Sequence, residues 1–309
     1  MKSAAVIGLG TMGAGIAATL ARGGLEVRAF DIDPQAVEKA RAALPAIAGV
    51  LESLGTPARG DATAVTFAGS LAEAVAGCGL VIENVPENLD LKKSVLAEID
   101  KLAESDSIIA SDTSGIPITK LQDGISHPGR VAGMHWSNPP HIIPMIEVIA
   151  GAGTDPATCQ ALVDLIRGLG LHPVQIKKDV PGFVENRVLY AIMREAIDLV
   201  EEGVIDPEAL DTCVSWGIGY KLSIVGPMRL LDMAGLDIYQ AVAGYLNAQL
   251  SDRKDVSAMI AARTGEGKLG IKSGEGLFSY RDQNLAELQA ERTRRFVAVR
   301  RALEQSDRS

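Results

Sequence analysis

The sequence predicts an α/β protein with a doubly wound, mostly parallel sheet, followed by an all-helical C-terminal domain. Short apolar, β-rich runs alternate with longer helical periods from residue 1 to about residue 178. Such alternation is typical of βαβ units that build a parallel sheet. A glycine-rich turn joins the first strand to the first helix, and beyond residue 182 the apolar periodicity is helical.

The expected elements follow one another in a regular order. Strands are expected at residues 4–8, 26–31, 65–67, 80–84, 108–111, 130–135, 145–150 and 172–176. Helices are expected at residues 13–22, 34–54, 89–103 and 155–169, and a long one over 183–202. The segment Val180-Pro181-Gly182 lies where the pattern changes, so the predicted domains are 1–181 and 182–309.

Composition bounds the class of protein. The 309 residues, 47% of them hydrophobic, are enough for two cores. With 39 acidic against 30 basic residues the net charge is −9, which argues against nucleic acid and anionic membranes as partners. We expect neither a secretory signal nor a membrane helix, because glycines interrupt the apolar N-terminal run. Cys78, Cys159 and Cys213 lack metal-site spacing, which predicts buried thiols in a reducing, cytoplasmic compartment.

The glycine-rich turn has the spacing of a dinucleotide-binding loop. It reads Gly8-Leu9-Gly10-Thr11-Met12-Gly13, directly after the first strand. Gly8 permits the tight turn, Gly10 lets the backbone approach a pyrophosphate, and Gly13 lets the helix pack on the strand. Thr11 and Met12 belong to the same loop, and the helix N-terminus supplies amide donors and a positive dipole.

Asp31 ends the second strand at the distance this fingerprint requires. Its carboxylate can accept both ribose hydroxyls and would repel a 2′-phosphate, which favours NAD over NADP. The alternative is a merely structural turn with a helix-capping aspartate. The loop context favours the first interpretation, so a Rossmann-type NAD-binding domain is expected.

His135 and Glu147 are the candidate acid–base pair. Glu147 lies within an apolar run that should form a buried strand, and a buried carboxylate needs a partner. The turn at Pro139-Pro140 would fold the chain back and bring His135 to Glu147, giving a general base with a fixed tautomer. The alternative is a core histidine and an edge-strand glutamate facing water. His141, in the turn, is expected to be a surface or substrate-contact residue.

Several motifs, in order along nearly the whole chain, resemble the 3-hydroxyacyl-CoA dehydrogenase family. They are GLGTMGAGIA, VIENVPENLDLKK, ASDTSGIPITKL, GMHWSNPPHIIPMIEVI, DVPGFVENRVL, GPMRLLDMAGLD and GKLGIKSGEGLFSY. The resemblance implies a Rossmann domain, a helical domain that usually dimerises, and an active site in the cleft between them. It therefore implies a homodimer formed through the C-terminal domain.

The resemblance also implies roles for individual residues. The catalytic positions are His135 as base, Glu147 as its orienting partner, and Ser114 and Asn186 as ligands of the substrate oxygen. Glu87 and Lys92 would contact the nicotinamide ribose, and Asn138 would support the His135 loop.

The sequence departs from the acyl-CoA pattern, which indicates a small, compact substrate. The segment Trp136-Ser137-Asn138-Pro139-Pro140-His141 is polar, and Arg59 is the only basic residue within 46–64. Three coenzyme A phosphates would lack cations there. The stretches around residues 112–120, 135–151 and 177–191 resemble a family member that oxidises a pyridine aldehyde carrying a carboxylate. Candidate ligands for that carboxylate are Lys221, Arg229, Lys268 and Lys272.

Other functions stay open at this point. One is an NAD-dependent dehydrogenase of a 3-hydroxy acid such as carnitine, gulonate or a short 3-hydroxyacyl-CoA. Another is an NAD-binding structural protein like the lens crystallin relative, which an intact His135 and Glu147 disfavour. The arginine-rich run over residues 287–301 is expected to be a solvated or dimer-facing helix.

Overall fold

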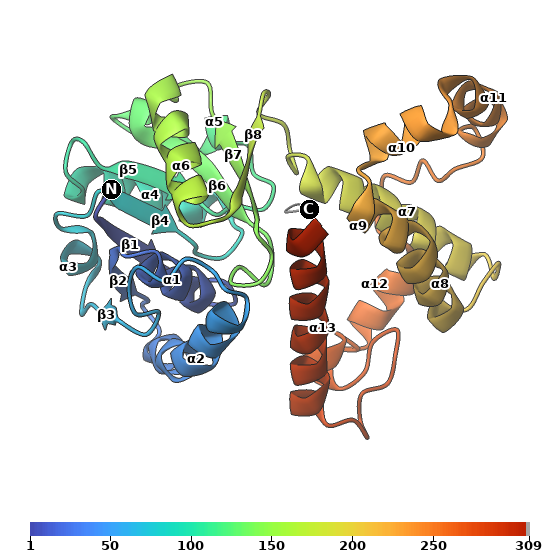
Figure 1. Cartoon of the computed structure of the whole chain (residues 1–309), viewed down its shortest axis with the longest axis horizontal. Helices are drawn as coiled ribbons and strands as arrows, with labels where there is room; N and C mark the ends of the chain where they lie inside the picture. Colours follow the sequence, from blue (N-terminus) through green and yellow to red (C-terminus); the bar gives the residue numbers. More distant parts are fainter. Residues whose placement is uncertain (307–309) are drawn as a thin grey trace. The chain divides into compact units, whose positions relative to one another are not determined.

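The computed structural model describes residues 1–306 and divides into two compact units, Met1–Arg187 and Val188–Ser309 (Figure 1). The first holds the sheet and the second is helical. The predicted boundary after residue 181 falls in the loop that precedes α7 (Glu185–Glu201).

The first unit is built on an eight-stranded sheet with the order β3-β2-β1-β4-β5-β6-β7-β8. The strands are β1 (Ser3–Ile7), β2 (Glu26–Phe30), β3 (Val65–Phe67), β4 (Leu80–Glu83), β5 (Ile108–Ser111), β6 (Val131–Trp136), β7 (Met145–Ala150) and β8 (His172–Ile176). All neighbouring pairs are parallel except β6 and β7. The predicted mostly parallel sheet and its eight strands are therefore confirmed.

Helices cover both faces of this sheet because the strands are apolar on both sides. One face packs against α1 (Gly13–Arg22), α2 (Pro34–Ser53) and α6 (Pro156–Gly168). The other packs against α3 (Leu71–Val75), α4 (Leu89–Leu102) and α5 (Ile118–Leu121). The helices α3 and α5 were not predicted, because they are too short to show a helical period.

The central strands position the site by their order. The strand order reverses at β1, because β2 and β3 lie on one side of it and β4 to β8 lie on the other. In open α/β sheets such a switch point leaves a crevice at the carboxyl ends of the strands. Gly8 and Asp31 directly follow β1 and β2, which brings these predicted cofactor residues to one edge of the sheet. Asp112, which was not predicted, directly follows β5.

The β6–β7 hairpin explains why His135 meets Glu147. The two strands are antiparallel, and His135 lies directly opposite Glu147 in their register. The backbone N–H groups of Ile142 and Ile143 both donate to the Pro139 carbonyl, at 3.0 and 2.9 Å, and close the turn. The predicted chain reversal at the proline pair is confirmed.

The second unit contains α7 from Val188 onward and the helices that follow it. They are α8 (Pro207–Cys213), a π-helical turn over Val214–Gly219, α9 (Tyr220–Ile224), α10 (Pro227–Ala234), α11 (Leu236–Leu246), α12 (Ala258–Gly265) and α13 (Leu285–Ser306). No helix within residues 1–306 is both long and apolar enough to cross a bilayer. Cys78 and Cys159 are buried as expected, whereas Cys213 is exposed at the end of α8, so that prediction was wrong for Cys213.

Candidate active site

The glycine loop has the geometry that a dinucleotide pyrophosphate requires. Gly8 has a φ of +101°, and a Cβ there would lie 2.4 Å from the Asn84 carbonyl oxygen. A Cβ at Gly13 would lie 2.2 Å from the Gly8 carbonyl oxygen, so only glycine fits beneath the start of α1. Gly10 has no atom within 4 Å of such a Cβ, which leaves its backbone open to a ligand.

Asp31 is tied to this loop. Its Oδ2 accepts a hydrogen bond from the Leu9 backbone N–H at 2.6 Å, and its Oδ1 accepts from the Asp33 N–H at 2.9 Å. The carboxylate is therefore held at the edge of the loop and remains partly exposed. Arg28 points elsewhere, because its guanidinium donates to the carbonyls of Glu73 and Ala76. A carboxylate at this position, with Arg28 directed away from it, fits NAD and disfavours a 2′-phosphate.

Alanine substitutions at Gly10 and Gly13 should separate binding from folding. We expect Gly13→Ala to lower the free energy of unfolding by about 1–3 kcal/mol, because its methyl group collides with the Gly8 backbone. We expect Gly10→Ala to leave the unfolding free energy unchanged and to weaken NAD binding about tenfold or more. Chemical denaturation and calorimetric titration with NAD check both. Equal losses of stability in the two variants would contradict the assignment of Gly10 to the ligand.

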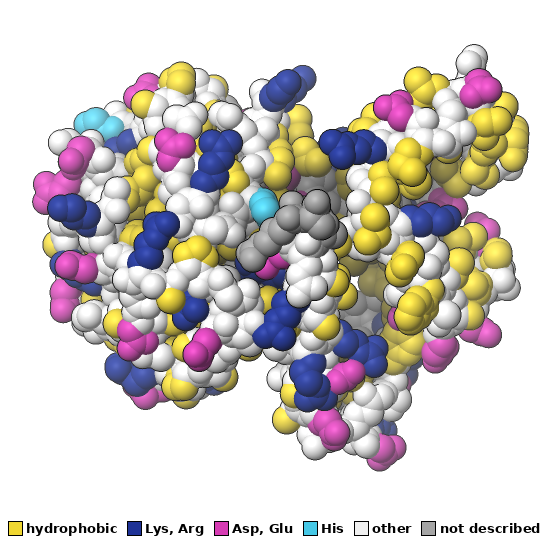
Figure 2. Space-filling model, in the orientation of Figure 1, with side chains coloured by type: hydrophobic (Ala, Val, Ile, Leu, Met, Phe, Trp, Pro, Cys, Tyr) yellow, Lys and Arg dark blue, Asp and Glu magenta, His cyan; other side chains and the backbone are white. Residues whose placement is uncertain are grey.

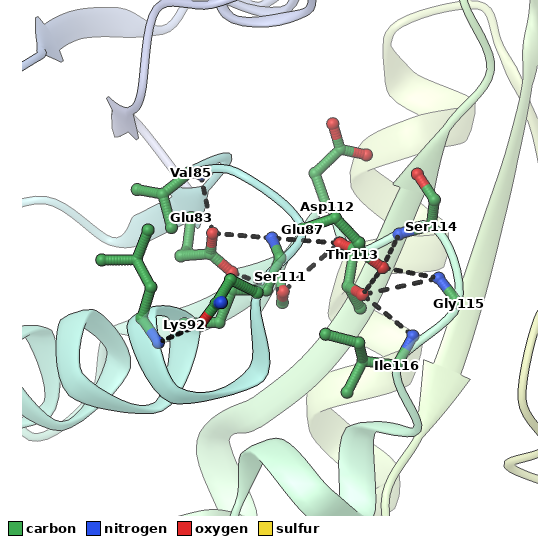
Figure 3. Close-up of polar contacts among 12 residues, drawn as sticks. Glu83, Val85, Glu87, Lys92, Ser111, Asp112, Thr113, Ser114, Gly115 and Ile116 are labelled. Atoms are coloured by element: carbon green, nitrogen blue, oxygen red, sulfur yellow. Dashed lines mark hydrogen bonds and ion pairs between the residues drawn. The ribbon is translucent and has the colours of Figure 1, made fainter. Parts of the chain in front are cut away.

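Glu87 organises the loop that follows β5 (Figure 3). Its Oε1 accepts from the Thr113 hydroxyl at 2.7 Å and from the backbone N–H groups of Gly115 at 3.1 Å and Ser114 at 3.2 Å. The glutamate side chain is 43% exposed, so it lies between this loop and solvent. Ser114 is exposed as well, and its hydroxyl makes no hydrogen bond with the residues that the structure describes.

Lys92 is placed differently from the expected ribose contact. Its side chain is 1% exposed, and its Nζ lies 2.9 Å from Glu83 Oε1 and 3.6 Å from Glu87 Oε2. Glu83 is fully buried at the end of β4 and also accepts from the Ser111 hydroxyl at 2.6 Å. Lys92 therefore supports Glu87 from beneath (Figure 3), and its direct contact with the ribose stays a prediction.

The His135–Glu147 pair is buried and closely bonded. His135 Nδ1 lies 2.8 Å from Glu147 Oε2, and the two side chains are 6% and 1% exposed. Since the carboxylate accepts a hydrogen from Nδ1, the Nε2 atom is left as the proton acceptor. Burial favours the neutral imidazole, but the hydrogen bond to Glu147 and the charges of Asp112, Glu147 and Glu185 outweigh it and raise the pKa of His135.

A left-handed turn before α7 holds the other oxygen of Glu147. Gly182 and Phe183 have φ values of +76° and +48°, and Phe183 is fully buried against the His135 ring. The turn aims the backbone N–H groups of Val184 and Glu185 at Glu147 Oε1, at 3.0 and 3.1 Å. Burial raises the pKa of Glu147, but its bonds to His135 and to these amides outweigh that and lower it.

Ser114 and Asn186 are joined in the structure. The Asn186 Nδ2 group donates to the Ser114 carbonyl at 2.6 Å, and the neighbouring Gly182 N–H donates to the Gly115 carbonyl at 3.0 Å. Because Asn186 directly follows Glu185, whose N–H binds Glu147, these contacts bring the Ser114 loop to the His135–Glu147 pair. The structure therefore gathers all four predicted catalytic residues, and their roles stay predictions.

Sequence reasoning missed two carboxyl groups here. Asp112 is buried after β5 and accepts from the Trp136 N–H at 2.8 Å, and burial raises the pKa of Asp112 to about 8 despite this bond. Glu185 accepts from the Ser137 hydroxyl at 2.5 Å. Asn138, expected to support the loop, is exposed and makes no side-chain hydrogen bond within the described chain, whereas the neighbouring Ser137 bonds to Glu185. Glu185 lies three residues after Gly182, and this glycine is the only feature of the sequence that could have pointed to Glu185.

His141, expected at the surface or in contact with substrate, is half-buried. Its Nδ1 is buried without a hydrogen-bond partner in the described chain, and burial lowers the pKa of His141 to about 4. The ring lies over α1, because a Cβ at Gly15 would be 3.0 Å from this nitrogen. Among the candidate carboxylate ligands, Lys268 is paired with Glu266 and Glu275 at 2.9 and 3.2 Å. The other candidates, Lys221, Arg229 and Lys272, are exposed in the helical unit.

Comparison with known proteins gives a consistent result along the chain. Residues 3–180 match the family described as 3-hydroxyacyl-CoA dehydrogenase, NAD binding domain, and residues 182–280 match its C-terminal domain. A 5-formyl-3-hydroxy-2-methylpyridine 4-carboxylate 5-dehydrogenase of Mesorhizobium japonicum is 61% identical over 306 residues, which cover 98% of this chain and 99% of that protein.

Two further relatives define the range of activities. A crystal structure of a 5-dehydrogenase for the same pyridine aldehyde, described as an NAD⁺-dependent dismutase, matches with a TM-score of 0.95 and 61% identity. The match covers 98% of this chain and 99% of the chain in that crystal structure. An L-carnitine dehydrogenase of Oceanobacillus iheyensis is 36% identical over 235 residues, 76% of each chain.

Proposed function

Since the chain belongs to the 3-hydroxyacyl-CoA dehydrogenase family, we propose that it oxidises 5-formyl-3-hydroxy-2-methylpyridine 4-carboxylate to the 5-carboxylate with NAD. The observation that carries the proposal is the likeness to a dehydrogenase of that aldehyde over 98% of the chain. The buried His135–Glu147 pair supplies the general base that this reaction needs. Gly10, Asp31 and Glu87 would hold the cofactor, with Gly8 and Gly13 shaping the loop.

The reaction begins with the addition of water to the formyl carbon, which gives a hydrate with two hydroxyl groups. His135 accepts a proton from one hydroxyl at Nε2, while Glu147 stabilises the positive charge that develops on the ring. Ser114 and Asn186 would hold the hydrate oxygens and favour the developing oxyanion. When bound, NAD supplies the acceptor for the hydride that leaves the same carbon, and the product is the carboxylate.

The burial of the two cysteines in the first unit favours oxidation through a hydrate over oxidation through a covalent thiohemiacetal. Cys78 and Cys159 are the cysteines of the first unit, and both are buried in its hydrophobic core. Burial raises the pKa of each thiol and so disfavours the thiolate that would attack an aldehyde. Oxidation through the hydrate needs no such nucleophile.

Substrate tests should measure the products as well as NADH. The structural relative is described as a dismutase, and an enzyme that reduces a second aldehyde would consume the NADH it forms. We therefore propose incubating the protein and NAD with the pyridine aldehyde, L-carnitine, gulonate or 3-hydroxybutyryl-CoA, followed by chromatography. Formation of the 5-carboxylate supports the proposal. Oxidation of another substrate with an unchanged pyridine aldehyde would overturn it and leave the family intact.

The rate of aldehyde oxidation should rise with pH through the pKa of His135. The imidazole must be neutral to accept a proton, and its pKa in the folded protein is raised from the ordinary value of 6.5. We expect the midpoint of kcat/KM above pH 6.5 in the wild type and at lower pH in Glu147→Gln, which lacks the negative charge. Initial rates in excess NAD measure both midpoints. A midpoint that does not move in the variant would contradict the role of Glu147.

We also propose that the protein is a cytoplasmic homodimer joined through its helical unit. Large apolar side chains are exposed on these helices, among them Trp216 at 75%, Met228 at 71% and Met233 at 72%. Apolar side chains gather over α10 and α11 in Figure 2, and such patches mark association surfaces. Light scattering should give twice the 32.5 kDa chain mass. A mass of one chain at micromolar concentration would contradict the dimer.

A further inference from the structure

Glu185 places a third carboxyl group beside the proposed catalytic pair. It is the first residue of α7, and its backbone N–H is fixed by Glu147. Its Oε2 accepts the Ser137 hydrogen bond, and ligand atoms of His135, Glu147 and Glu185 all lie within 4.8 Å of one another. Both the backbone and the side chain of Glu185 are therefore held beside the His135–Glu147 pair.

The surroundings of Glu185 favour the binding of a positively charged ligand group. No lysine or arginine within residues 1–306 forms an ion pair with Glu185 or Glu147, and the Oε1 atom of Glu185 accepts no hydrogen bond there. Two nearby carboxylates repel each other unless a positive group lies between or beside them. His135 supplies one when protonated, but the base must be neutral when it accepts a proton.

A metal ion is a weaker explanation for this cluster. Both oxygens of Glu147 are already committed, one to His135 and the other to two backbone amides. A cation bound by all three side chains would have to break these bonds. Glu185 alone has an uncommitted carboxylate oxygen, which suits one hydrogen-bond donor rather than a coordination shell.

The proposed substrate has a donor at the matching place. In its ring, one carbon separates the nitrogen from the carbon that bears the formyl group. The carboxylate is attached on the other side of the formyl group. With the formyl carbon at His135, the ring can therefore turn either its nitrogen or its carboxylate toward Glu185. A carboxylate there would be repelled, whereas a protonated ring nitrogen would form a charged hydrogen bond.

We propose that Glu185 binds the protonated ring nitrogen of the substrate and thereby sets the orientation of the ring. This inference rests on the proposed function, since it takes the pyridine aldehyde as substrate. Ser137 is the positioning residue, because its hydroxyl holds one oxygen of Glu185 and leaves the other for the ring. Together, Glu185 and Ser137 make the site specific for a pyridine ring over a benzene ring of the same shape.

The test compares two substrates in three proteins. The substrates are the pyridine aldehyde and its benzene analogue, in which C–H replaces the ring nitrogen. The proteins are the wild type, Glu185→Gln, and Glu202→Gln as a control that removes an exposed charge beyond the end of α7. We expect the wild type to prefer the pyridine by roughly 10- to 100-fold in kcat/KM, the value of one charged hydrogen bond.

In Glu185→Gln we expect kcat/KM for the pyridine to fall by about the same factor, with little change for the benzene analogue. Equal losses for both substrates would show that Glu185 acts only through His135 and would overturn the proposal. Equal wild-type rates for the two substrates would overturn it without any variant. Activity that requires an added divalent metal would also overturn it. No oxidation of the pyridine aldehyde by the wild type would instead overturn the proposed function, and this inference with it.

Discussion

Replacing His135 with alanine should lower kcat for aldehyde oxidation by about 10²–10⁴-fold, the contribution of a well-placed general base. The imidazole is the buried group whose free nitrogen can accept the hydroxyl proton, and Glu147 fixes its tautomer through a 2.8 Å contact. The change should leave NAD affinity intact, because the glycine loop and Asp31 follow β1 and β2 rather than β6.

The matched control is His172→Ala, which removes an exposed histidine at the start of β8. We expect its kcat to equal the wild-type value. Product formation measured by chromatography, with NAD binding measured by calorimetry, separates a chemical defect from a folding defect. Near wild-type turnover by His135→Ala would show that His135 is not the general base.

Replacing Glu83 with glutamine should lower the free energy of unfolding by about 3–5 kcal/mol, since it leaves the buried Lys92 without its main partner. Glu83 is fully buried, and Lys92 is 1% exposed. Adding Lys92→Met should recover most of the loss, because the double variant buries neither charge. Glu87 would lose its support from Lys92 only in the double variant, so the KM for NAD should rise there.

Lys93→Met provides the control at the neighbouring position. Lys93 pairs with Asp123, whose side chain is 78% exposed, and a surface pair contributes below about 1 kcal/mol. Denaturation in urea, followed by circular dichroism, ranks the variants. If Glu83→Gln were as stable as Lys93→Met, the buried pair would not support the fold.

The sheet could be predicted because its strands are short, apolar and regularly spaced. Glu147 was also predictable, since a carboxylate within an apolar strand needs a partner and the proline turn returns the chain to His135. Glu83 carries the same signal within Leu80–Glu83, and its pairing with Lys92 shows that this signal marks structural carboxylates too. The family resemblance pointed to Lys92 as a ribose contact, but it could not reveal that the side chain is buried.

Other parts of the site depend on three-dimensional detail that no spacing encodes. Glu185 reaches Ser137 only because Gly182 and Phe183 adopt left-handed backbone conformations, and Phe183 is not a residue type that favours one. The raised pKa of Asp112 follows from its burial beside the Trp136 backbone at the end of β6. His141 looked exposed because it lies in a polar turn, but the turn packs on α1 at Gly15.

Transfer of the formyl hydrogen to the cofactor tests whether His135 promotes hydride transfer from the hydrate. The pyridine aldehyde is deuterated at its formyl group and mixed with NAD and an excess of the protein. Mass spectrometry then measures the masses of the products of a single turnover. We expect one deuterium on the reduced cofactor for each 5-carboxylate formed, and formation of both products to be about 10²–10⁴-fold slower with His135→Ala. Formation of the carboxylate with unlabelled cofactor, or no carboxylate from the wild type, would contradict this mechanism.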